Sequence, residues 1–170
     1  MSSLAIRQKL IDIAIGEVGT TEKGRNTGKR IIEYQRATAL EGTGWPYCAA
    51  FVCWCLREWG RDPDVLAHLG LTPAKFERWR PKTPAAFGFE DWAAKLGLQT
   101  FNDSEAHQLR TGDLMVFDMS HIGLVTGDRG SLVNTIEGNT SATGSRDGEG
   151  VYAKTRQRRE ARTFIRILPP

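Results

Sequence analysis

The apolar and polar positions in the first third of the chain repeat with helical spacing. We predict a first helix that Ser3 caps and that ends at Gly19, because apolar residues recur on one face between them. A loop containing Gly and Asn leads to a second short amphipathic helix around Tyr34. Residues 48–59 predict a third helix with an apolar face, since Pro46 keeps the preceding chain out of it.

The next stretch interrupts this pattern. Residues 61–90 contain four prolines among short apolar runs, so we predict a Pro-rich, irregular connection with one helical turn around residues 73–79. A short helix over residues 91–96 follows and ends at Gly97. The helical half of the chain therefore ends before residue 100.

A strand-type pattern occupies the rest of the chain. Three short β-rich runs separated by turn residues predict an antiparallel meander, and two later runs extend the same sheet. Helices first and strands afterwards is the α+β pattern, so we predict N-terminal helices packed on a small antiparallel sheet. The runs are GDLMVFD (112–118), HIGLVTG (121–127), SLVNTIE (131–137), VYAKT (151–155) and TFIRIL (163–168).

Length and composition are those of an ordinary globular protein. The 170 residues fit a single domain spanning 1–170, and a net charge of +3 does not identify a partner. The longest apolar run has nine residues, whereas a membrane span needs about 20, so we expect no membrane insertion. Charged residues interrupt the N-terminus where a Sec signal needs an apolar core, which predicts synthesis in the cytoplasm without such a signal.

All three cysteines fall within GWPYCAAFVCWC (44–55). An odd number with spacings of five and two fits neither a disulfide framework nor a paired zinc site, which leaves packing or one reactive thiol. A thiol attacks as its thiolate, and the positive end of a helix dipole favours that form. Cys48 lies in the first helical turn, whereas Cys53 and Cys55 lie deeper and are predicted to be packing residues.

A nucleophilic thiol needs a base, and His121 is the candidate because it opens a predicted strand. His68 and His107 lie in polar connections. A hairpin turning through residues 127–130 pairs residues whose numbers sum to about 258, which places Glu137 opposite His121. A carboxylate there can orient the imidazole.

Asn139 follows two residues after Glu137 and can offer an amide to the histidine or to a substrate. Taken singly, Cys48 and His121 fit ordinary structural roles, and Glu137 fits a solvated strand end. Taken together, the thiol, the imidazole and the carboxylate form one mechanism, so we favour catalysis.

The stretch WPYCAAFVCWCL, followed by GDLMVFD, HIGLVTG and TIEGNT, resembles the CHAP family of cysteine peptidoglycan amidohydrolases and endopeptidases, within the wider NlpC/P60 papain-like group. The N-terminal EVGTTEKGRNTGKRIIEYQ and the later DWAAKLG resemble the helices that precede the sheet in that family. The resemblance implies a papain-like fold and a Cys-His-Glu-Asn site, carried here by Cys48, His121, Glu137 and Asn139. The connection over 61–90 is longer than the family pattern, which leaves the bond specificity open.

Some relatives bind calcium through an Asp-rich loop before the nucleophile. Residues 41–47 offer only Glu41, so we predict no metal and no cofactor. The aromatic residues around the nucleophile, Trp45, Tyr47 and Trp54, can stack on sugar or peptide, with core packing as the alternative. Trp54 lies off the predicted apolar face and is the better candidate for exposure.

The resemblance implies bacterial peptidoglycan as substrate, cut at the sugar-to-peptide amide or within the stem or crossbridge. Two settings fit: a phage lysin, or an antibacterial effector that a secretion machine injects and an immunity protein counters. In both, the protein acts on the wall in the periplasm or outside the cell.

Two other classes of function stay open. The same scaffold can bind wall polymer or a protein without turnover. The basic stretch 154–166 can also be read as a nucleic-acid patch, but it lacks interleaved aromatic residues. We therefore predict a solvated loop there and no nucleic-acid partner.

Overall fold

The structure is a computed structural model and describes residues 1–104, 108–141 and 148–168. These residues form helices α1 to α6, a single 3₁₀ turn and the six-stranded antiparallel sheet, which confirms the α+β class. The helices are α1 (Ser3–Ile15), α2 (Lys29–Gln35), α3 (Cys48–Trp59), α4 (Pro63–Leu69), α5 (Pro73–Trp79) and α6 (Gly88–Leu96). The strands are β1 (Gln99–Phe101), β2 (Leu114–Phe117), β3 (His121–Arg129), β4 (Leu132–Thr140), β5 (Gly150–Gln157) and β6 (Ala161–Arg166).

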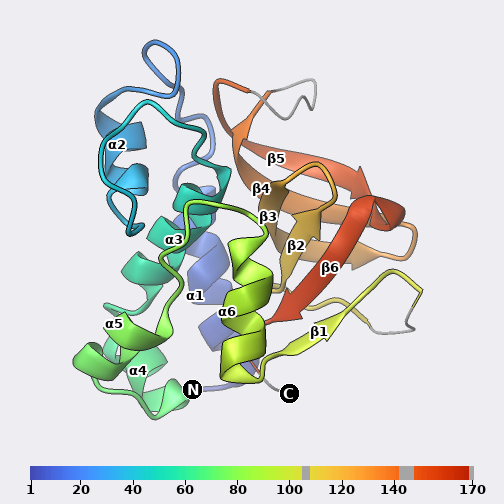
Figure 1. Cartoon of the computed structure of the whole chain (residues 1–170). Coiled ribbons are helices and arrows are strands. Elements are labelled where there is room, and N and C mark those ends of the chain that lie inside the picture. The colour runs from blue at the N-terminus through green and yellow to red at the C-terminus, as the bar shows by residue number, and fades with distance from the viewer. Residues whose placement is uncertain (105–107, 142–147, 169–170) are drawn as a thin grey trace.

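Helix α3 lies near the centre of the molecule, in contact with α1, α2, β3 and β4 (Figure 1). Its bounds are those that the sequence predicts. It packs against α1 and α2 on one side and against β3 and β4 on the other, so residues on every side of it are buried, including Cys53 and Trp54. The single apolar face expected from the sequence is therefore too narrow a description of α3.

The ends of α1 differ slightly from the prediction. Ser2 caps the helix by accepting a hydrogen bond from the Ala5 N–H, so the cap lies one residue before Ser3. The helix ends at Ile15, where Gly16 is the C-cap, and the chain reaches Gly19 through turns. Helix α2 forms where the second amphipathic segment predicts it.

The Pro-rich connection contains two helices rather than one turn. Helix α5 has the predicted bounds, but α4 was not expected from the sequence. Each helix has proline in its first turn, where the missing N–H costs nothing, and a side-chain cap just before it, from Asp62 and Thr72. These prolines start helices instead of breaking them. Helix α6 extends the predicted short helix by three residues at its N-terminal end.

The strands occur in the order β1-β6-β2-β3-β4-β5. Strand β1 was not predicted; it pairs with β6 at one edge. Apolar side chains cover both faces of the sheet. One set, which includes Leu124 and Ile136, packs on the helices, and a second cluster includes Phe117 and Val133.

The close approach of α3 to β4 depends on a glycine. A Cβ atom built on Gly138 would lie 2.6 Å from the Cβ of Phe51, well inside any real contact. Because Gly138 has no side chain, the N-terminal half of α3 can lie directly on the end of β4. This contact sets the distance between the helix that carries Cys48 and the strand that carries Glu137.

The β3–β4 hairpin turns later than predicted. Arg129 pairs with Leu132, so the turn consists of Gly130 and Ser131 rather than residues 127–130. A register shift between Val125 and Gly127 follows, after which Leu124 pairs with Ile136. The predicted sum of about 258 is therefore wrong: the ladder runs at a sum of 260 near the site.

The basic stretch near the C-terminus is not a solvated loop. It forms β5, the 3₁₀ turn Arg158–Glu160 and β6, and four of its five arginines bind carboxylates of the protein. Arg158 pairs with Asp128 at 3.2 Å, and Arg162 pairs with Glu90 at 3.1 Å. These ion pairs direct much of the positive charge inward, which disfavours the nucleic-acid interpretation.

Candidate active site

Cys48 is the first residue of α3, and the first helical hydrogen bond runs from the Phe51 N–H to the Tyr47 carbonyl oxygen. No side chain caps the helix at Tyr47. The N–H groups of the first turn have no partner within a helix, so they are available to stabilise negative charge at the thiol or on a bound substrate. The thiol itself is reduced, and Cys48 is 7 % exposed.

His121 begins β3 and is fully buried. Its Nε2 atom lies 2.8 Å from Oε2 of Glu137, which is also fully buried. The other ring nitrogen, Nδ1, has no hydrogen-bond partner among the described residues. The ring therefore has one nitrogen fixed by a carboxylate and one nitrogen without a fixed partner.

Burial and neighbouring charges act in opposite directions on His121. Burial alone lowers the pKa of a histidine, but the interactions with Cys48 and Glu137 outweigh it and raise the pKa of His121 to about 9. Because Cys48 is one of the groups that raise the pKa of His121, the thiol lies close to the imidazole. The raised pKa favours the imidazolium form, which is able to donate a proton.

Glu137 stays ionised for a similar reason. Burial raises its pKa, but hydrogen bonds and charges from Arg156 and His121 outweigh burial and lower the pKa to about 2. Arg156 donates from Nε to Oε1 at 2.8 Å and from Nη2 to Oε2 at 2.5 Å. Thr135 donates its hydroxyl to Oε1 at 2.6 Å. The sequence analysis missed both of these partners of Glu137.

Glu137 reaches His121 diagonally rather than from the opposite position. Continuing the ladder from the Leu124–Ile136 pair places Gly123, not His121, across from Glu137. A Cβ atom on Gly123 would lie 2.7 Å from Cγ of Glu137, so the side chain passes over the space that the glycine leaves free. The predicted contact between His121 and Glu137 therefore exists, but the two residues are not paired across the strands as predicted. The missing side chain at Gly123 makes room for the contact.

The other cysteines and histidines occupy different environments. Burial raises the pKa of Cys53 to about 12 and raises that of Cys55 well above its usual value, which makes both thiols unreactive packing residues, as predicted. His68 lies in α4 and contacts the Ser3 hydroxyl at 3.4 Å. His107 lies outside the described residues.

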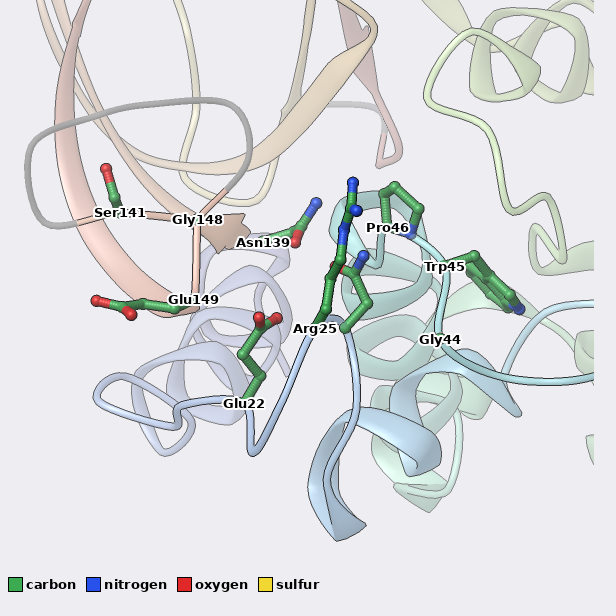
Figure 2. Close-up of a pocket in the computed structure, with 10 residues that line it drawn as sticks. Glu22, Arg25, Gly44, Trp45, Pro46, Asn139, Ser141, Gly148 and Glu149 are labelled. Carbon is green, nitrogen blue, oxygen red and sulfur yellow. The ribbon is translucent and has the colours of Figure 1, made fainter.

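A pocket of about 640 Å³ lies next to the candidate site. Residues close in sequence to Cys48 and to Glu137 line it. Trp45 and Pro46 line it from the loop before α3, and Asn139 lines it from the end of β4 (Figure 2). Asn139 is nearly fully buried and has a φ of 53°, a left-handed conformation that asparagine tolerates. Its side chain lies beside Pro46 and Arg25 in Figure 2.

Charged side chains also line this pocket. Glu22 and Arg25 come from the loop after α1, and Glu149 comes from just before β5. Oε2 of Glu22 is buried and has no hydrogen-bond partner among the described residues. The loop is held beside β5 by a hydrogen bond from the Glu22 N–H to the Glu149 carbonyl oxygen. The resemblance includes Glu22, but sequence reasoning gave it no role.

Two of the three aromatic candidates are part of the core. Tyr47 is fully buried and packs near Tyr34, with ring centroids 6.2 Å apart. Trp54 is 6 % exposed, so the prediction that it is the most exposed of the three is wrong. It packs edge-on against Tyr34, and the guanidinium of Arg30 covers it at 4.5 Å. Trp45 alone lines the pocket.

Among the described residues, no group of three or more His, Cys, Asp or Glu side chains is placed to hold a metal ion. Glu41, the one acidic residue of the loop before α3, is exposed. In the same residues no helix is both long and apolar enough to span a membrane.

A family model, the CHAP domain, matches residues 39–139, and the chain therefore belongs to the CHAP domain family. The match includes Cys48, His121, Glu137 and Asn139, and it ends before β5. The family is one of peptidoglycan hydrolases, with amidase and endopeptidase activities that depend on cysteine and histidine. No curated protein and no solved structure matches the chain.

Proposed function

We propose that the protein hydrolyses an amide bond of peptidoglycan, with Cys48 as the nucleophile. The bond is the N-acetylmuramoyl-L-alanine amide or a peptide bond of the stem or crossbridge. The observation that carries the proposal is the buried His121 ring, which binds Glu137 through Nε2 and interacts with Cys48. A buried imidazolium between a carboxylate and a thiol at a helix N-terminus is the arrangement that acyl transfer requires.

The reaction proceeds in two steps. The Cys48 thiolate attacks the carbonyl carbon, a C–S bond forms, and the N–H groups at the start of α3 stabilise the oxyanion. His121 then donates its proton to the leaving nitrogen as the C–N bond breaks, which releases an amine and leaves a thioester. Neutral His121 next removes a proton from water, the water oxygen attacks the thioester, and the C–S bond breaks to release the carboxylic acid and regenerate the thiolate.

The roles of the remaining site residues follow from their positions. Glu137 orients His121 and stabilises the imidazolium. Asn139 lies in the wall of the pocket, where its amide can bind the substrate peptide. The carboxylates of Glu22 and Glu149 and the guanidinium of Arg25 line the same pocket. These charges suit a peptide stem that bears free amines and carboxylates. We therefore place the stem in this pocket, with Trp45 packed against it.

Replacing Trp45 tests this placement. We expect Trp45→Ala to raise KM with kcat within about twofold, because stacking contributes to binding rather than to the chemical step. Trp92→Phe is the matched control, since Trp92 packs on Trp79 and does not line the pocket. Steady-state kinetics on soluble wall fragments give both constants. An unchanged KM for Trp45→Ala would contradict the proposal that the peptide stem binds in this pocket.

The central experiment compares wild type with Cys48→Ala on peptidoglycan sacculi, and mass spectrometry identifies the fragments. We expect fragments from the wild type alone, and their new termini distinguish amidase from endopeptidase. The substitution removes one buried sulfur atom, so a thermal melt should show a folded protein. If neither protein releases fragments from sacculi of several wall chemistries, the hydrolase proposal fails and a binding module on this scaffold replaces it.

The biological setting is part of the same proposal: a phage lysin or an antibacterial effector, made in the cytoplasm and active on the wall after release or injection. An immunity protein or a secretion component is a partner only in the second setting. Expressing wild type and Cys48→Ala with and without an export signal tests where the protein acts. Lysis should require both export and Cys48, and lysis by the retained protein would contradict the proposal.

A further inference from the structure

Arg156 binds the carboxylate that orients the histidine. It comes from β5, beyond the residues that the family model matches. Its guanidinium binds Glu137 with two hydrogen bonds, 2.8 Å from Nε to Oε1 and 2.5 Å from Nη2 to Oε2. Two-point binding of this kind fixes the plane of a carboxylate as well as its position.

The two oxygens of Glu137 share their hydrogen bonds between Arg156 and other partners. Oε1 accepts from Arg156 and from the Thr135 hydroxyl, and Oε2 accepts from Arg156 and contacts Nε2 of His121. The carboxylate therefore cannot rotate toward or away from His121 without breaking a bond to Arg156. Because every group involved is buried, each broken bond leaves a polar atom without water to replace it.

Phe117, on the neighbouring strand β2, packs against both Arg156 and His121. Its ring centroid lies 5.4 Å from that of His121, and the Arg156 guanidinium carbon lies 5.3 Å from the same ring. The two cations therefore lie around one aromatic ring, with Glu137 bound to both. This packing fixes Arg156 relative to His121 as well as to Glu137.

We propose that Arg156 is a positioning residue of the reaction: it fixes the orientation of Glu137, so that the carboxylate presents one oxygen to His121 throughout turnover. The proposal rests on the function proposed above for Cys48 and His121. The charged groups that face this network are the Cys48 thiol from α3, His121 from β3, Arg156 from β5 and Glu160, which acts on Arg156 from the 3₁₀ turn.

In the state that attacks the substrate in the proposed mechanism, the charges alternate along this chain of groups: thiolate, imidazolium, carboxylate, guanidinium. Removing the guanidinium charge leaves a net negative charge in a buried site, which makes proton loss harder for every group in it. The protonation steps that limit activity on the acid side and on the alkaline side should then both move to higher pH. A residue that only packs the sheet would not shift either limit.

The test compares Arg156→Met, Arg156→Lys and a control, Arg158→Met, which breaks ion pairs to Asp103 and Asp128 on the same segment of chain. The first readout is the pH profile of kcat/KM on wall fragments. The second is the pH dependence of Cys48 alkylation by iodoacetamide, which needs no substrate. A thermal melt confirms that each variant is folded.

We expect Arg156→Met to lower kcat on the order of 10²-fold with little change in KM, because the misplaced imidazole affects the chemical step. Both pH limits and the alkylation profile should move up by about one unit. Arg156→Lys should restore the pH limits but not kcat, since an ammonium is a point charge without the planar fork. Arg158→Met should leave both profiles unchanged.

Three results would overturn the proposal: full kcat in Arg156→Lys, unshifted profiles in a folded Arg156→Met, or the same shifts in Arg158→Met. If Arg156→Met does not fold, Arg156→Lys still decides through its kcat. If the wild type releases no wall fragments, the hydrolase function fails; the alkylation profile then tests separately whether Arg156 controls the Cys48–His121 pair.

Discussion

Among the residues that the structure describes, two fully buried carboxylates are bound by arginine, and only one of them adjoins a reactive group. Asp113, just before β2, is fully buried and binds Arg166 at 2.9 Å and Arg7 at 3.3 Å. Its Oδ2 also accepts a hydrogen bond from the Arg110 N–H at 2.9 Å. This network links α1, the start of β2 and β6. None of the partners named here loses a proton at ordinary pH.

Glu137 has an arginine too, but its remaining partner is an imidazole that interacts with a thiol. The difference lies in that one partner rather than in burial or charge. A carboxylate held only by guanidinium groups is a structural link, because arginine does not give up its proton in proteins. A carboxylate shared between arginine and histidine can control a group that gains and loses a proton near the operating pH.

The largest effects should come from removing the charge of each carboxylate in turn. We expect Glu137→Gln and Asp113→Asn each to lower the free energy of unfolding by about 3–5 kcal/mol, because each leaves buried arginine without its counter-charge. Only Glu137→Gln should also lower kcat of the folded enzyme, by about 10²–10⁴, while keeping residual activity. Urea unfolding and kinetics corrected for the folded fraction separate the two effects.

Equal loss of kcat in the two variants, after that correction, would contradict the distinction between the two carboxylates. A kcat for Glu137→Gln as low as that for Cys48→Ala would also be unexpected, because removing the nucleophile should cost more than removing the group that orients its base.

A smaller effect should appear in the pH dependence. His121 has its pKa raised to about 9, so kcat/KM should fall as pH rises through about 9, where the imidazolium loses the proton that the leaving amine needs. The raised pKa also contributes stability that is fully present below about 6.5 and is lost as pH rises through about 9. Rate and melting profiles from pH 5 to pH 10 measure both.

The effect of Glu137 on the pKa of His121 can be measured in the pH profile of kcat/KM. Glu137→Gln removes a negative charge that stabilises the imidazolium, so its alkaline limit should move to lower pH. Asp113→Asn should leave that limit in place, because Asp113 is not among the groups that shift the pKa of His121. An alkaline limit unmoved in Glu137→Gln would show that another group sets it.

The smallest effect should follow from a single added methyl group. Gly123→Ala places a Cβ atom 2.7 Å from Cγ of Glu137, so the side chain must shift away from His121. We expect about a tenfold loss of kcat and a destabilisation of about 1–3 kcal/mol from overpacking. Gly127→Ala is the control on the same strand, since its Cβ atom would meet Asn134 at an ordinary 3.6 Å. A kcat for Gly123→Ala equal to that of the wild type would show that the contact of Glu137 with His121 does not depend on the space at Gly123.

The sequence predicts the parts of the site that depend on local patterns. Pro46 and the apolar periodicity after it place the start of α3 at Cys48, and the alternation around His121 places it at the start of a strand. Both predictions need only neighbouring residues. The relation between His121 and Glu137 was predicted from turn geometry, and there the register was wrong because the turn lies at Gly130 and Ser131 rather than at residues 127–130.

The partners of Glu137 could not be predicted in the same way. Arg156 lies 19 residues further along, in a run of basic residues that composition alone assigns to solvent. Its burial depends on β5 pairing with β4, which brings it onto the same face as Thr135 and Glu137. Trp54 shows the same limit: helical periodicity gives its direction from the axis of α3, but α2 on that side buries it.

The strand order has a consequence for how the molecule assembles. Strand β6 is the last strand in chain order, yet it lies inside the sheet, between β1 and β2 (Figure 1). Until β6 is in place, β1 has no partner and β2 has an open edge, which is where strands from other chains can add. The sheet is thus closed by a contact of long sequence separation, which makes its formation slow relative to the local helices. The base and its carboxylate lie on β3 and β4, which pair with each other through a short hairpin, so their contact does not depend on this last step.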